Sequence, residues 1–95
     1  MDIAHTPLVF TIHGPIRRDD LPGLCERVCA LFAATRADTA LCHCASVAAD
    51  AVTVDALARL QLAARRHGLR VRLHDASAEL LDLVRFMGLD DVLAE

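Results

Sequence analysis

Apolar residues form short runs along the chain whose spacing is typical of β-strands. Leu8 to Ile12 is rich in β-branched and aromatic residues, and Ile16, after a Gly-Pro turn signal, is expected to begin a short second strand. Thr39 to Cys44 is almost continuously apolar, which predicts a strand buried on both faces, as in a parallel sheet. From Arg70 to His74 polar and apolar residues alternate, which predicts a strand with one wetter face.

Three longer segments place apolar residues every three or four positions, the spacing of amphipathic helices. They predict helices at about residues 19–34, 50–68 and 77–88, and we expect a last helical turn at residues 89–93. Capping residues, an early proline and terminal glycines mark these helix ends (Asp20, Pro22, Asp50, Thr53, Gly68, Ser77 and Gly88). Leu62 points away from the buried stripe of the second helix, and Phe86 lies off that of the third, so both are expected to be exposed.

Strands that alternate with helices predict an α/β fold with a sheet of about four strands. Right-handed crossovers would make the last strands parallel. The 95 residues leave room for a single domain, residues 1–95. Hydrophobic residues make up 55% of the chain but only three residues are aromatic, so the core must be built mainly from Leu, Val and Ala.

The net charge of −3 argues against a protein that binds the phosphate backbone of nucleic acids. No apolar stretch reaches the roughly 18 residues that span a bilayer, so no membrane insertion is expected. The first residues lack the pattern of a signal peptide, which favours a cytoplasmic location. Because the cytosol is reducing, the four cysteines are interpreted as free thiols.

The cysteines and histidines are the residues that would supply chemistry. Cys25 and Cys29 are four apart on a predicted helix, and Cys42-His43-Cys44 is a tight cluster. Neither pair has the spacing of a structural zinc site, and free cysteine is among the most buried residue types, so we predict core thiols, no metal site and no cofactor. His43 is expected on the other sheet face from its neighbours. Other histidines at predicted element ends are interpreted as solvated loop residues (His13, His67 and His74).

No acid–base constellation meets the geometric requirements of catalysis, so the chain is not expected to be an enzyme. The second half of the sequence instead resembles a known family. The residues that carry the resemblance are segments 54–60, 63–68, 71–73, 80–81 and 87–89. They look like a STAS domain, the fold of bacterial anti-sigma factor antagonists, over about Leu8 to Leu93. The resemblance implies a STAS-like α/β domain whose mixed sheet of about four strands is covered by helices.

In that family an Asp-Ser-Ser/Thr-Gly-Leu motif opens the second helix, and a partner kinase, itself an anti-sigma factor, phosphorylates a Ser there. By resemblance Asp55 matches the family Asp, whereas Ala56 and Leu57 stand where the hydroxyl residues should be and Ala58 replaces the Gly. Adding phosphate charge at a helix start is a sound switch, but both phosphoacceptors are missing here. Thr53 is either a displaced phosphoacceptor or simply a residue of the helix cap.

The resemblance implies a non-catalytic, cytoplasmic protein-binding module that acts in transcription regulation, with an anti-sigma factor kinase as partner. The alternative within the family is a subunit of a larger complex, such as a lipid-transport ABC system, where it would contact the ABC ATPase, or a sensory assembly. A third hypothesis, from another class, is a small-molecule or metal sensor that uses a sheet-end cavity or the thiols. A homodimer through a sheet edge or the Leu62 face is left open. The candidate partner contacts are Asp50, Thr53, Asp55, Ala56, Leu57, Arg59 and Leu62.

Overall fold

Parallel strands and α-helices alternate along residues 6–89, the part of the chain that the structure, a computed structural model, describes. The elements are β1 (Leu8–Thr11), the 3-10 helix η1 (Arg18–Asp20), α1 (Leu21–Ala34), β2 (Thr39–His43), α2 (Ala51–Arg66), β3 (Arg70–His74) and α3 (Ala78–Phe86). The α/β class expected from the alternation of strands and helices is therefore confirmed.

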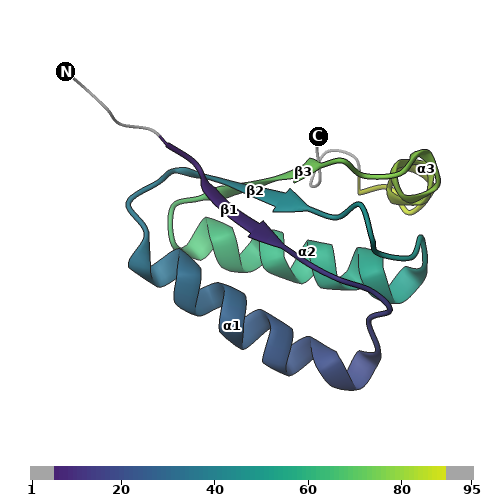
Figure 1. Cartoon of the computed structure of the whole chain (residues 1–95), viewed down its shortest axis with the longest axis horizontal. Helices are drawn as coiled ribbons and strands as arrows, with labels where there is room; N and C mark the ends of the chain where they lie inside the picture. Colours follow the sequence, from purple (N-terminus) through teal and green to yellow (C-terminus); the bar gives the residue numbers. More distant parts are fainter. Residues whose placement is uncertain (1–5, 90–95) are drawn as a thin grey trace.

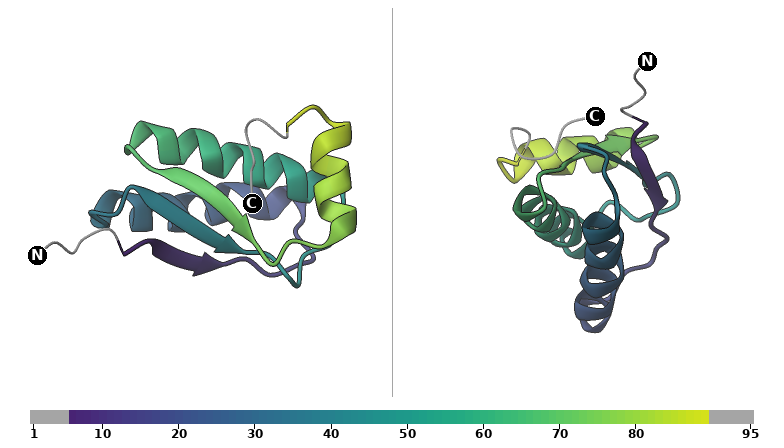
Figure 2. Two further views of the ribbon diagram at one scale, coloured as in Figure 1. Left: turned by 90° about the horizontal axis from the view of Figure 1, so that it is seen from above. Right: turned by 90° about the vertical axis from the view of Figure 1, so that its left-hand side faces the viewer.

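The described sheet has three strands in the order β1-β2-β3, and both neighbouring pairs are parallel. Both crossover helices, α1 and α2, lie on the same face of this sheet (Figure 1), and the end-on view in Figure 2 places them side by side below it. This follows when crossovers of one hand step across a sheet in one direction. The core lies between this face and the two helices, and it includes Phe10, Phe32, Cys42, Leu57, Leu60 and Val71.

The four-stranded mixed sheet expected from the sequence is not confirmed, because residues 6–89 contain three strands and all are parallel. The short strand expected at Ile16 is absent, although its side chain is buried. Just after Ile16 the backbone N–H of Arg17 donates to the Asp20 carboxylate at 3.0 Å. This local contact starts η1 and leads directly into α1, so the segment turns into a helix instead of pairing along a strand.

The strand β2 was expected to be buried on both faces, but its burial alternates. Ala40 and Cys42 are buried toward the helices, whereas Leu41 and His43 are half-buried on the other face. Within residues 6–89 no helix covers that second face, because α3 lies across the carboxyl end of the sheet beside the start of α2 (Figure 2). We call this side the open face; Val9, on β1, is 54% exposed there.

The helix ends follow the capping residues closely. The Asp50 carboxylate accepts the backbone N–H of Thr53 at 2.8 Å, and the Ser77 hydroxyl accepts that of Leu80 at 3.1 Å. Gly68, with φ of +78°, ends α2 as predicted. Of the helical turn predicted at residues 89–93, Leu89 is not helical and the other residues lie outside the described part. None of the described helices has both the length and the apolar character that crossing a membrane would require.

Replacing Gly14 with alanine is expected to lower the free energy of unfolding by about 1–3 kcal/mol, because overpacking forces the backbone to shift. A Cβ atom at Gly14 would lie 3.0 Å from the Cα of Val47 and 3.2 Å from the backbone N of Ala48. These are main-chain atoms that cannot rotate aside. Urea unfolding of the variant and of the native chain measures the change. Equal midpoints and slopes would contradict the prediction, because they would show that the backbone at Gly14 and at Val47 moves apart without loss of stability.

Candidate functional site

The candidate contacts named from the sequence lie on two sides of α2. Thr53, Ala56 and Leu57 have 0% exposure and face the core. The remaining four are reachable from solvent (Asp50, Asp55, Arg59 and Leu62). A partner that docks on this structure can therefore contact only the second group.

The start of α2 explains this division. Because the helix begins at Ala51 and Asp50 is its N-cap, Asp55 lies in the second turn of the helix and not at its opening. A family motif that opens the helix would therefore begin at Asp50, where Ala51 and Val52 follow it without a hydroxyl. The Thr53 hydroxyl is buried and has no hydrogen-bond partner among the described residues, so it is not accessible for modification. Asp50, and not Thr53, supplies the cap.

A charged cluster covers the outer side of α2 beside η1. Asp55 accepts hydrogen bonds from Arg59 at 2.9 and 3.3 Å and from Arg18 at 3.2 Å. The Arg59 guanidinium, followed by that of Arg18, holds the pKa of the Asp55 carboxyl below its ordinary value. Leu62, two turns along from Asp55 on the same side of α2, is 55% exposed. We call Arg18, Asp55, Arg59 and Leu62 the α2 face.

The thiols occupy the core or its margin. Cys42 and Cys44 are buried, as predicted, and Cys25 and Cys29 are half-buried. Hydrogen bonding with the Cys44 thiol, together with burial, raises the pKa of Cys42 far above its ordinary value. Burial, and then the neighbouring Cys29, raises the pKa of Cys25. Neutral thiols are poor nucleophiles, so the raised pKa values of Cys25 and Cys42 favour a packing role for these two residues.

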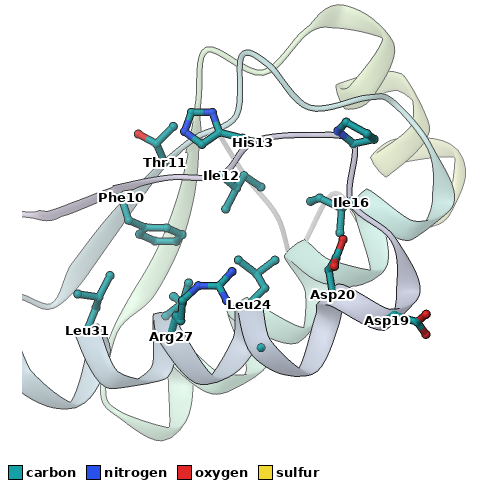
Figure 3. A pocket seen from close by; sticks show the side chains of 13 residues that line it. Phe10, Thr11, Ile12, His13, Ile16, Asp19, Asp20, Leu24, Arg27 and Leu31 are labelled. Carbon is teal, nitrogen blue, oxygen red and sulfur yellow. The ribbon is translucent and has the colours of Figure 1, made fainter.

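A pocket of about 680 Å³ opens between β1 and α1, away from the α2 face, and sequence reasoning missed it. Figure 3 shows Phe10, Ile12 and Leu31 along its apolar side, with the Arg27 side chain reaching in from α1. Asp19 and Asp20, on η1, also line it, and Thr11 and His13 line it from the chain of β1. Its size suits a small ligand, but its polar groups are spread over β1, η1 and α1. All of its lining residues lie between Phe10 and Leu31, but no sequence motif marks it, because the pocket forms only when β1 and α1 pack side by side.

The open face gathers histidines at the carboxyl end of the strands. His74 is exposed at the end of β3, the strand predicted from Arg70 to His74, and is the register partner of His43 on β2. Their ring centroids are 4.5 Å apart, and Asp75 follows directly. His13 lies nearby in the chain that leaves β1, and its Nδ1 is 3.3 Å from the Ser46 hydroxyl. Sequence reasoning missed this grouping because it depends on strand register.

The sequence matches no known family model and no curated protein.

Proposed function

We propose that this protein is a non-catalytic, regulatory protein-binding module, similar to an anti-sigma factor antagonist, that docks on its partner through the α2 face. The observation that carries the proposal is the exposed Leu62 beside the ordered Arg18–Asp55–Arg59 cluster. An exposed apolar side chain next to ordered polar groups supplies both kinds of contact that a protein interface uses. The hydrogen bonds among the three charged residues hold the rim in one arrangement before a partner arrives.

The chemistry of the face describes the surface that would fit it. Two guanidinium groups and one carboxylate give it a net charge of +1, next to the apolar Leu62. A partner surface with an apolar pocket and an acidic rim is complementary to this arrangement. By resemblance the partner is an anti-sigma factor of the ATP-binding kinase type, and an ABC ATPase of a lipid-transport system is the alternative.

Partner binding in this proposal does not depend on phosphorylation near the start of α2. If the family motif is aligned on Asp55, the hydroxyl positions hold Ala56 and Leu57; if it is aligned on the helix start, they hold Ala51 and Val52. The Thr53 hydroxyl is buried in either case. Binding is therefore constitutive, or it is set by the amounts of the two proteins.

Replacing Leu62 with aspartate is expected to weaken partner binding by about tenfold or more, since truncating an interface anchor costs 2 kcal/mol or more. The measurement is capture of a candidate anti-sigma kinase on the immobilised chain, followed by affinity measurement in solution. Phe86→Asp is the matched control, because Phe86 is 86% exposed on α3, outside the α2 face. Both changes place a charge where solvent already reaches, so both variants should keep the fold.

Equal affinities of the native chain and the Leu62→Asp variant would contradict docking through the α2 face. If the native chain captures an ABC ATPase and not the kinase, and the Leu62→Asp variant captures neither, the α2 face is still the docking surface. That result would favour the transport complex as the partner. Loss of partner binding in the Phe86→Asp control alone would indicate that the interface lies on α3.

A further inference from the structure

We infer that His43, His74 and Asp75 form a binding site for a divalent transition metal of the Zn²⁺ class at the carboxyl end of β2 and β3. Each residue offers one ligand atom, and these atoms all lie within 4.8 Å of one another. Two imidazole nitrogens and one carboxylate oxygen are ligands that zinc accepts readily, and three protein ligands leave a coordination position open. The sequence had predicted no metal site, because only the cysteine spacings were weighed for one.

Strand register brings the two histidines together. His43 and His74 are Cα partners on adjacent parallel strands. Alternation along each strand turns both side chains to the open face, since the preceding residues, Cys42 and Leu73, are buried toward the helices. Figure 1 shows β2 and β3 ending side by side at this edge.

The distances are close to those that a metal requires. His43 Nδ1 is 3.8 Å and His74 Nε2 is 3.7 Å from Asp75 Oδ2. Two ligand atoms bound to one tetrahedral zinc ion are about 3.3–3.6 Å apart, given metal–ligand bonds of about 2.0–2.2 Å. Both imidazole–carboxylate distances are thus within a few tenths of an ångström of that geometry. The third distance, between the two imidazole nitrogens, is no more than 4.8 Å. Side-chain rotation can shorten it, because the three side chains are 34%, 50% and 60% exposed.

The backbone beneath these side chains is held in place. The His43 carbonyl accepts the N–H of Ile12 at 3.1 Å, and the His74 carbonyl accepts that of Cys44 at 3.1 Å, so hydrogen bonding continues past the strand ends. Asp75 has a φ of +61°, in the left-handed region that residues other than glycine rarely adopt. Such conformations concentrate at functional sites, and here the turn keeps the carboxylate beside both rings.

The site is independent of the other features of the molecule. The buried thiols of Cys42 and Cys44 lie on the helix side of the sheet, so they are not its ligands. Figure 2 shows α2 on one side of the sheet. The His43 and His74 side chains alternate to the other side, since Cys42 and Leu73 are buried toward the helices. Evidence for or against the metal site is therefore independent of the proposed partner binding. Without a metal, the same geometry would amount to two exposed imidazole–carboxylate pairs, and the experiment separates these two cases.

The test is a calorimetric titration of the full chain, free of any polyhistidine tag and kept reduced, with Zn²⁺ and in parallel with Co²⁺. We expect one metal per chain. Metal binding should weaken by about tenfold or more in each of three variants, His43→Gln, His74→Gln and Asp75→Asn. Loss of a residue that only supports a ligand lowers metal affinity at least about tenfold, and loss of the ligand itself should lower it no less. His67→Gln is the matched control, because His67 is exposed at the end of α2, beside the opposite end of β3.

A second readout is the melting temperature. Zn²⁺ should raise it in the native chain and in the His67→Gln variant, since a ligand that binds only the folded state stabilises it, and should leave it unchanged in the His74→Gln variant. Circular dichroism checks that the variants are folded. Unchanged affinity in both histidine variants would overturn the proposal, as would the absence of stoichiometric binding. Loss of binding on changing Cys25 and Cys29 to serine, with the histidines intact, would assign the metal to the thiols instead.

Discussion

Replacing Ala56 with glutamate is expected to destabilise the protein strongly, because it places a carboxylate where the native side chain has 0% exposure. The penalty for burying an unpaired ion is several kcal/mol, and we expect a loss of about 3–5 kcal/mol or more. Domains of this size have only about 5–15 kcal/mol of stability in total. Circular dichroism and urea unfolding measure the effect.

Ala51→Glu is the matched control for this change. Ala51 is exposed in the first turn of the same helix, where a negative charge interacts favourably with the helix dipole. We expect the control to stay within about 0.5 kcal/mol of the native stability. If Ala56 were a surface contact, as the sequence alone suggested, both variants would fold equally well and only partner binding would suffer. An Ala56→Glu variant as stable as the Ala51→Glu control would therefore contradict the position of α2 described above.

Replacing Gln61 with leucine is expected to lower the free energy of unfolding by about 2–4 kcal/mol, although leucine is the more hydrophobic residue. The Gln61 side chain is 2% exposed. Its amide nitrogen donates to the carbonyl of Val71 at 3.1 Å, and its oxygen accepts the N–H of Val71 at 2.9 Å. Gln61 thus satisfies both backbone groups of one residue on β3, the edge strand of the described sheet, as a neighbouring strand would do. Leucine leaves both groups buried and unpaired.

The neighbouring position provides the reverse substitution as a control. Leu62→Gln exchanges the same two residue types at a side chain that is 55% exposed, where we expect a change within about 0.5 kcal/mol. Thermal and urea unfolding of both variants give the comparison. Equal stability of the Gln61→Leu variant and the native chain would mean that water or a shifted backbone replaces the two hydrogen bonds.

Much of the local structure was predictable from the residues. Pro22 early in α1, the caps at Asp50 and Ser77, and Gly68 after α2 marked the helix ends to within about two residues. The exposure of Leu62 and Phe86 also followed from helical periodicity. These features depend on residues close together in the chain, where the physics of caps and of helical spacing acts within one or two turns.

The number of strands and the coverage of the sheet were not predictable in the same way. Ile16 has the composition of a strand residue, yet the contact between Arg17 and Asp20 turns its segment toward a helix. The apolar run at β2 suggested burial on both faces, but both crossover helices cover the same side. Which face a helix covers depends on the handedness and order of the crossovers, a property of the assembled sheet.

The features of the candidate sites also divide into those set by neighbouring residues and those set by tertiary packing. The sequence alone determined the α/β class, the helix ends and an exposed apolar residue on α2, because each follows from short-range periodicity and capping. Only the tertiary structure decided that Ala56 and Leu57 are buried, that Gln61 completes the edge of β3 and that His43 meets His74 and Asp75. These contacts join residues brought together by strand register and helix packing. The spacing of neighbouring residues determines neither the register nor the packing.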